Sequence, residues 1–278
     1  MQLVAEKPAT DTIKAQMNYI IDTGTPPVHY VDWPEMEKNA IPAQYRHHEM
    51  AIRNGRPLRD TFKLDTHGFV FADHPTKVAD FTDEAERKRV YDPEVAELIK
   101  KYSGASEVVV FDHTIRTGDE ATRTATSARP PVKGVHNDYT EKSAPQRLRD
   151  ILGDAEAERR MRKRWAIIQV WRPIRGNVLI DPLGICDARS IPQEGFILLQ
   201  RRYQHRTAEV YHIAYNPAHV WFYFPEMTRN EALVFKVFDS DESQMARFTA
   251  HSAFDDPNTP PDAPPRESIE TRTFAFWD

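Results

Sequence analysis

The chain has 278 residues, of which 40% are hydrophobic and 28% are charged, with a formal net charge of -5. These values are typical of a globular protein with one large domain, and the acidic balance argues against a nucleic-acid partner. No run approaches the length of apolar residues that spans a membrane, so we expect no membrane partner either. The N-terminal segment lacks the apolar core of a signal peptide and Cys186 is the sole cysteine, which together favour a cytoplasmic protein without an internal disulfide.

The first part of the chain predicts a mixture of short elements. Residues 65–71 (DTHGFVF) have the pattern of a short strand or hairpin. Two helical segments should follow, because Thr82 or Asp83 can cap the first and Asp92, followed by proline, suits the start of the second. We expect residues 1–105 to form a helical and irregular extension.

From about Val108 onward the chain is rich in strand-forming residues. One charge-dense helix is expected at 145–164, and its basic end reads as a solvated face. The other runs are strand-like: 165–173, 177–180, 195–201, 209–215, 219–224, 232–238 and 268–277. Short strands around one long helix predict a mainly β fold, a jelly roll (double-stranded β-helix) over 106–278, packed with the extension into a single domain.

The sharpest local motif is GVHNDYT at residues 134–140. Side chains alternate between the two faces of a strand, so His136 and Asp138 point to the same side. An imidazole nitrogen and a carboxylate oxygen placed in this way can bind one metal ion. A second histidine would complete the two-histidine, one-carboxylate triad that leaves open positions on iron(II).

The C-terminal part supplies the missing ligand and an anion-binding pair. His251 lies in FTAHSAF, ahead of a proline-rich loop that leads to Arg266 and Ser268. A guanidinium fork beside a hydroxyl is well suited to a carboxylate, because the fork can hold both oxygens. The order HxD, distal histidine, RxS is what a 2-oxoglutarate site needs, since this keto acid chelates iron at one end and carries a second carboxylate at the other.

These motifs lie in a chain that resembles a largely fungal group of secondary-metabolite oxygenases. The group includes cephem methoxylase subunits, gibberellin desaturase, the hydroxylase of aspergillic acid biosynthesis and the endoperoxide-forming oxygenase of novofumigatonin biosynthesis. The resemblance covers about residues 59–277 and rests on the following segments: VVVFDHTIR, GVHNDYT, QVWRPIRGNVLIDPLGICDARS, HVWFYFPEMTRNEALVFKVFDS, ARFTAHSAF and PPRESIETR.

The resemblance implies a jelly-roll core, iron(II), molecular oxygen and 2-oxoglutarate. It implies that His136, Asp138 and His251 are the metal ligands, and that Arg266, with Ser268 beside it, holds the distal carboxylate. The stretch from His251 to Arg266 is longer than is usual in the broader superfamily, so Arg272, on the same strand face, remains a second candidate for that role.

Other residues are candidates for the pocket, each with a structural alternative. Gln169 and Trp171 share one face of WAIIQVWRP. Gln169 suits the metal-bound end of the keto acid or a core hydrogen bond, and Trp171 suits the pocket or core packing. Tyr139 and Thr140 follow the metal motif and can line a substrate pocket, although Tyr139 could equally pack under the helix.

His113 and Arg116, in FDHTIR, are candidates for the N-terminal edge of the pocket. The alternative is an ordinary buried polar network. The sequence does not decide between them.

The expected function is oxidation of an unactivated C–H bond in a small secondary-metabolite intermediate, such as a meroterpenoid, by hydroxylation, desaturation or endoperoxide formation. The aromatic run HVWFYF favours a largely apolar substrate. The alternatives are an iron oxygenase that does not consume 2-oxoglutarate, and a non-catalytic barrel-type partner subunit like those paired in the cephem system. A zinc hydrolase fits less well, because the RxS pair would lack a purpose. A homodimer is compatible with the sequence.

Overall fold

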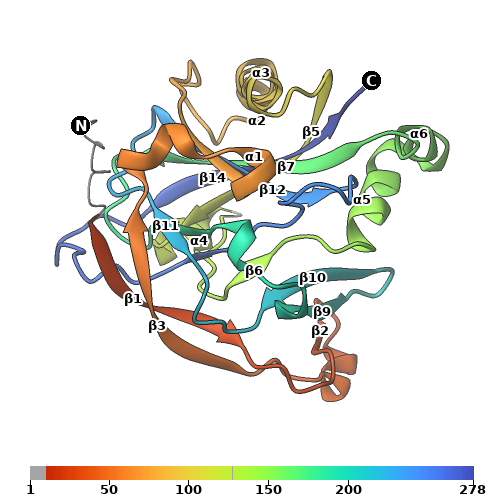
Figure 1. Cartoon of the computed structure of the whole chain (residues 1–278), viewed down its shortest axis with the longest axis horizontal. Helices are drawn as coiled ribbons and strands as arrows, with labels where there is room; N and C mark the ends of the chain where they lie inside the picture. The colour runs from red at the N-terminus through yellow and green to blue at the C-terminus, as the bar shows by residue number, and fades with distance from the viewer. Residues whose placement is uncertain (1–10, 127) are drawn as a thin grey trace, which may run out of the picture.

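Two β-sheets packed face to face form the core of the molecule (Figure 1). The computed structural model describes residues 11–126 and 128–278, so the first ten residues of the expected extension lie outside the described residues. Within the described part, the first sheet has nine strands in the order β1-β3-β11-β8-β13-β6-β10-β9-β2. Their bounds are β1 Thr12–Ile20, β3 Tyr45–Asn54, β11 Trp221–Tyr223, β8 Leu183–Cys186, β13 His251–Ala253, β6 His136–Asn137, β10 Thr207–Ile213, β9 Phe196–Arg202 and β2 Val28–Tyr30.

The second sheet has five strands in the order β4-β12-β7-β14-β5, within the same described residues. Their bounds are β4 Phe69–Asp73, β12 Glu231–Asp239, β7 Trp165–Arg175, β14 Glu267–Phe276 and β5 Glu107–Thr117. The predicted mainly β fold is therefore confirmed.

Strand β7 is buried on both faces, which explains its nearly continuous apolar sequence. Ile167 and Trp171 point into the core between the sheets, while Ile168 and Val170 point outward. The outward face is covered by helix α3, Asp92–Ser103, through buried side chains such as Ile99. Gln169 and Trp171 consequently lie on the inner face, where the sequence left the choice of face open.

The segments expected as two helices before β5 run together. Helix α2, Glu84–Glu86, continues through a π-helical turn, Arg87–Tyr91, directly into α3. Asp83 caps its start by accepting hydrogen bonds from the backbone N–H groups of residues 85 and 86. Gly104, with φ +71°, ends α3 in the left-handed conformation that glycine adopts without strain.

The single helix expected at 145–164 is two helices in the structure. Helix α5, Ser143–Leu152, and α6, Asp154–Arg160, are separated by Gly153, whose φ of +79° cannot continue an α-helix. The charge pattern is continuous across Gly153, which is why the break was not predicted.

The N-terminal extension contributes strands as well as helical turns. Strands β1 and β3 pair antiparallel along their whole length at one edge of the first sheet, and β4 pairs with β12 in the second. The division of the chain at residue 105 stays a prediction, since nothing in the architecture tests it. The remaining short helices are α1 Leu64–His67, α4 Glu120–Ala125 and the 3-10 turns Pro34–Asn39, Arg56–Thr61, Ala188–Ser190 and Gln193–Gly195.

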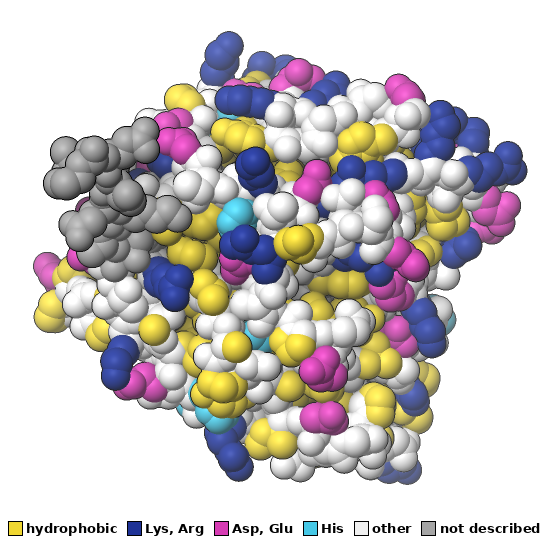
Figure 2. Space-filling model, in the orientation of Figure 1, with side chains coloured by type: hydrophobic (Ala, Val, Ile, Leu, Met, Phe, Trp, Pro, Cys, Tyr) yellow, Lys and Arg dark blue, Asp and Glu magenta, His cyan; other side chains and the backbone are white. Residues whose placement is uncertain are grey.

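The face of the molecule in Figure 2 carries basic and acidic side chains interspersed with apolar ones. None of the described helices combines the length and the apolar character needed to cross a bilayer.

Candidate metal centre

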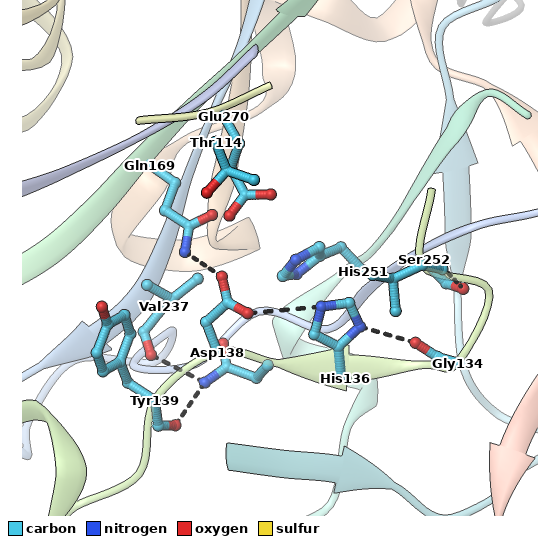
Figure 3. Close-up of polar contacts among 12 residues, drawn as sticks. Thr114, Gly134, His136, Asp138, Tyr139, Gln169, Val237, His251, Ser252 and Glu270 are labelled. Atoms are coloured by element: carbon cyan, nitrogen blue, oxygen red, sulfur yellow. Dashed lines mark hydrogen bonds and ion pairs between the residues drawn. The ribbon is translucent and has the colours of Figure 1, made fainter. Parts of the chain in front are cut away.

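Three predicted ligands meet between the two sheets. Strands β6 and β13 are antiparallel neighbours, and their register places His251 directly opposite His136. Asp138 follows β6 by one residue. One ligand atom from each of the three side chains lies within 4.8 Å of the others, and Nε2 of His136 is 3.5 Å from Oδ1 of Asp138. Figure 3 shows the two imidazole rings and the carboxylate turned toward one another.

Hydrogen bonds leave the Nε2 atoms of both histidines available to a metal. Nδ1 of His136 is 2.7 Å from the carbonyl oxygen of Gly134, and Nδ1 of His251 is 3.3 Å from that of Thr249. A carbonyl oxygen can only accept, so each Nδ1 carries the proton and each Nε2 presents a lone pair. This arrangement of a backbone partner behind a ligating imidazole is typical of metal sites.

The protonation states also suit a cation. Burial, followed by the neighbouring His251, lowers the pKa of His136 to about 4, and burial likewise lowers the pKa of His251. Burial by itself would raise the pKa of Asp138, but Arg272 and the two histidines outweigh it and hold that pKa well below its usual value. At neutral pH the donor set is two neutral imidazoles and one carboxylate, which is the facial triad of non-haem iron(II) sites.

Asp138 is held on its far oxygen by two side chains from the other sheet. Nε2 of Gln169 in β7 donates to Oδ2 of Asp138 at 2.5 Å, and Nη2 of Arg272 in β14 does so at 3.2 Å. Oδ1 remains directed toward His136, as the dashed lines in Figure 3 show. Gln169 therefore contacts a candidate metal ligand rather than only filling the core.

A narrow cavity of about 20 Å³ lies beside the triad, with room for a group about the size of a water molecule. Arg266 lines it together with both histidines and Trp171. The guanidinium of Arg266 is 3% exposed, lies over the Trp171 ring at 5.4 Å and donates to the carbonyl of Asp181. Within the described residues it has no carboxylate partner.

Three of the candidate residues have a buried polar atom without a hydrogen-bond partner among the described residues, and of these three Arg266 lines the cavity. The atoms are Nε of Arg266, Oγ of Ser268 and Oε1 of Gln169. Burial lowers the pKa of Arg266 to about 10, so the guanidinium is still charged at neutral pH. Asp181 and Glu270 favour this charge without forming an ion pair with it. Burying a cation without an ion pair is costly, and a bound anion would reduce that cost. The residues present therefore fit a keto acid that carries a second carboxylate.

Arg272 has different surroundings from Arg266. It is paired with Asp112 at 2.8 Å, with Asp138 at 3.2 Å and with Glu270. Three carboxylates already compensate its charge.

The remaining candidates fall in several places. Tyr139 lines a cavity of about 820 Å³ that also reaches Asp138. Thr140 is buried and its hydroxyl accepts the backbone N–H of Ser143 at 3.0 Å, so its visible role is to hold the start of α5. Arg116 lines both the narrow cavity and a larger one and is 3.2 Å from Glu270.

His113 lies on the opposite face of β5 from Arg116. Its ring is 2.8 Å from Asp92 of α3 and 2.9 Å from the hydroxyl of Thr271. A spacing of three along a strand places two side chains on opposite faces, so His113 belongs to the buried polar network under α3. The prediction that His113 lines the pocket together with Arg116 is therefore wrong, and the alternative of a buried polar network describes His113.

Two residues near the metal centre were missed in the sequence. His212 lies opposite His136 in the pairing of β10 with β6, and the Tyr45 hydroxyl is 3.2 Å from its Nδ1. Both line a further cavity of about 530 Å³, which also has His136 and Asp138 in its wall. The register between distant strands brings them there, and no local motif carries that information.

Comparison with known proteins agrees with this geometry. A family described as "Oxidoreductase/YMDC permease-like domain" matches residues 17–276. The chain is 37% identical to the hydroxylase/desaturase CTB9 of Cercospora beticola, over 84% of this chain and 78% of that protein. It is 32% identical to the Fe(II)/2-oxoglutarate-dependent dioxygenase nvfI of Aspergillus novofumigatus, over 82% and 83% of the two chains.

The solved structure of the iron and alpha-ketoglutarate-dependent endoperoxidase NvfI matches with a TM-score of 0.86 and 26% identity, covering 96% of this chain and 98% of that one. The jelly-roll fold and the resemblance inferred from the motifs are thereby confirmed. This chain belongs to the family of fungal hydroxylases, desaturases and Fe(II)/2-oxoglutarate-dependent dioxygenases that includes these proteins.

Proposed function

We propose that this protein is an Fe(II)/2-oxoglutarate-dependent oxygenase that oxidises an unactivated C–H bond of a small molecule. The observation that carries the proposal is the convergence of His136, Asp138 and His251 within 4.8 Å, with Nδ1 of each histidine bonded to a backbone carbonyl. Iron(II) bound there would couple reduction of molecular oxygen to decarboxylation of the keto acid and oxidation of the substrate.

The chain's own residues have separate parts in this scheme. The three ligands hold the metal, and Gln169 keeps the free oxygen of Asp138 from rotating toward it. Arg266 holds the distal carboxylate of 2-oxoglutarate, because it is a buried guanidinium that lines the narrow cavity beside the triad and has no ion pair, and Ser268 offers a hydroxyl beside it. Arg272 stabilises the ionised form of Asp138.

The outcome of C–H oxidation depends on how the substrate lies in the cavity of about 530 Å³, which is next to Asp138. Hydroxylation, desaturation and endoperoxide formation all fit a secondary-metabolite intermediate with a mainly apolar skeleton. We further propose a single domain of two parts, 1–105 and 106–278, a cytoplasmic location, and a homodimer as the oligomeric state to examine first.

The test is an anaerobic titration of the metal-free protein with iron(II) and then 2-oxoglutarate, followed by the visible charge-transfer band of a chelated keto acid. We expect a band in the wild type, no iron binding in His136→Ala, and iron binding with a strongly weakened 2-oxoglutarate response in Arg266→Gln. Arg175→Gln, at a side chain that is 81% exposed, is the matched control and should behave as the wild type.

Iron binding without a band would replace the proposal with an oxygenase that does not use 2-oxoglutarate. Absence of iron binding in the wild type would favour the non-catalytic partner subunit. If the band forms as expected, one succinate formed per molecule of oxidised product would confirm stoichiometric use of the keto acid.

A further inference from the structure

The two large cavities of the molecule meet at the metal centre. The cavity of about 530 Å³ and the cavity of about 820 Å³ share five lining residues. These are Arg129, Asp138, Arg201, Val210 and Arg272. Two of them, Arg129 and Arg201, therefore lie in the walls of both cavities, and the proposed reaction assigns them no part.

The charges of the shared arginines differ in how they are compensated. Arg272 is paired with three carboxylates, and Arg116, also in the smaller of the two cavities, is paired with Glu270. For Arg129 and Arg201, the described part of the chain offers no side-chain hydrogen bond and no ion pair. Arg129 is exposed and Arg201 is half-buried, so both can reach a ligand without first breaking a contact.

Acidic groups are scarce in the 530 Å³ cavity. Asp138 is the one carboxylate that lines it within the described residues, and this carboxylate belongs to the metal triad. The 820 Å³ cavity is mixed in charge, with Asp112, Asp150 and Glu209 in its wall. The excess of positive charge is therefore greater in the 530 Å³ cavity, where four arginines face one carboxylate, than in the 820 Å³ cavity, where five arginines face four carboxylates.

Apolar side chains form much of the remaining wall of the 530 Å³ cavity, beside the polar residues His29, Tyr45 and His212. Val28, Ile41 and Pro42 line it from the N-terminal extension, and Leu199 and Val210 line it from β9 and β10. Apolar walls with a few placed polar groups are the usual composition of a small-molecule site, in which the polar groups fix orientation. Here the polar groups include guanidinium forks, which match a planar carboxylate.

We propose that the substrate has an apolar body and an acidic group of the carboxylate class, and that Arg129 and Arg201 bind this group and so orient the body toward the metal. The inference rests on the proposed oxygenase function and names the substrate class for that site. The keto acid is a separate ligand, because neither Arg129 nor Arg201 lines the narrow cavity that contains Arg266.

The test compares two rigid probes of similar size and shape, one anionic and one neutral: adamantane-1-carboxylate and adamantane-1-carboxamide. Binding is measured by calorimetry, without oxygen, to the protein loaded with iron(II) and saturating 2-oxoglutarate, so that the keto-acid site is already filled. We expect the carboxylate to bind about tenfold more tightly than the amide, a modest ratio because both arginines are partly solvated.

Arg201→Gln and Arg129→Gln should each reduce this preference, and the double variant should abolish it. Arg201→Glu should reverse it in favour of the cation 1-adamantanemethylammonium. Arg202→Gln is the matched control, because Arg202 is the next residue of β9 and its side chain bonds Gln200 and Tyr30 instead. This control should keep the wild-type preference.

Equal binding of the two probes to the wild type, or a preference that survives the double variant, would overturn the inference. In either case the charge-transfer band would be intact, because the arginines do not hold the keto acid. Absence of the band itself would instead count against the oxygenase function, so the two failures are distinguishable.

Discussion

Gln169 donates a hydrogen bond of 2.5 Å to Oδ2 of Asp138, and it does so from the sheet opposite the one that carries β6. The contact leaves Oδ1 of Asp138 directed toward His136. Loss of a side chain that orients a metal ligand commonly lowers metal affinity by about 10- to 100-fold. We expect Gln169→Ala to weaken iron(II) binding by about tenfold, as measured by competition with a chelator.

Gln16→Ala is the control for this substitution, because Gln16 is an exposed residue of β1. It should bind iron as the wild type does. Unchanged iron affinity in Gln169→Ala would show that the carboxylate keeps its orientation through Arg272 alone.

Gly68 connects α1 to β4, and its carbonyl oxygen accepts a hydrogen bond of 3.2 Å from the hydroxyl of Thr249, two residues before His251. Its φ is +87°, and a Cβ at this position would collide with the hydroxyl of Thr249. Gly104 has a similar φ of +71° but has open space around it. Alanine at Gly104 should therefore cost only the backbone strain, about 1 kcal/mol, whereas alanine at Gly68 adds a steric clash of roughly 1–3 kcal/mol.

Urea unfolding of both variants measures the difference in the free energy of unfolding. Because the carbonyl of Thr249 accepts from His251, Gly68→Ala should also weaken iron binding, and Gly104→Ala should not. Equal losses of stability in the two variants would mean that Thr249 moves aside without cost.

The parts of the site that were predictable are those set by local chain geometry. His136 and Asp138 share a face because strand side chains alternate, and Gln169 and Trp171 share one for the same reason. His251 required the order of motifs along the chain and the family resemblance, since no local rule brings β13 beside β6. The pairing of β10 with β6, which places His212 next to His136, depends on strand register across more than seventy residues.

The errors in the predicted elements have one local and one non-local cause. The break at Gly153 is a single backbone conformation within a continuous pattern of charge. The N-terminal strands β1 and β3 read as irregular because β3 is a distant partner of β1 along the chain, and further pairing comes from the other half of the fold: β11 pairs with β3, and Gly134 bridges to Asn18 of β1. Non-local pairing of this kind overrides local propensity.

Lys236 is a buried cation whose removal should destabilise the fold. It is 1% exposed, and its amino group is 2.7 Å from Asp239 and 2.8 Å from Asp65. In Lys236→Met, the fully buried Asp239 keeps only Arg164 as a cationic partner, and breaking a buried pair in this way costs about 3 kcal/mol.

The control is Lys88→Met, which removes an exposed ion pair with Glu84 of the same 2.7 Å length. Exposed pairs contribute less than about 1 kcal/mol. Urea unfolding should separate the two variants clearly, and comparable losses would show that burial of Lys236 carries no special cost.

His219 makes the stability of the protein depend on pH. Its ring is 5% exposed, Nδ1 lies 3.1 Å from the Tyr19 hydroxyl, and burial lowers the pKa of His219 from 6.5 to about 4. Between these two values the unfolded chain binds a proton that the folded chain does not. Stability conferred by neutral His219 is therefore complete above pH 6.5 and decreases toward pH 4, by up to roughly 1.4 kcal/mol per pH unit.

Unfolding free energies of the wild type and His219→Gln, measured without metal from pH 7.5 to pH 4.5, test this dependence. We expect the variant to lose less stability than the wild type over that range, because one proton-linked group has been removed. His205→Gln, at an exposed histidine, should follow the wild-type curve. Parallel curves for wild type and His219→Gln would mean that the folded protein protonates His219 as readily as the unfolded chain does.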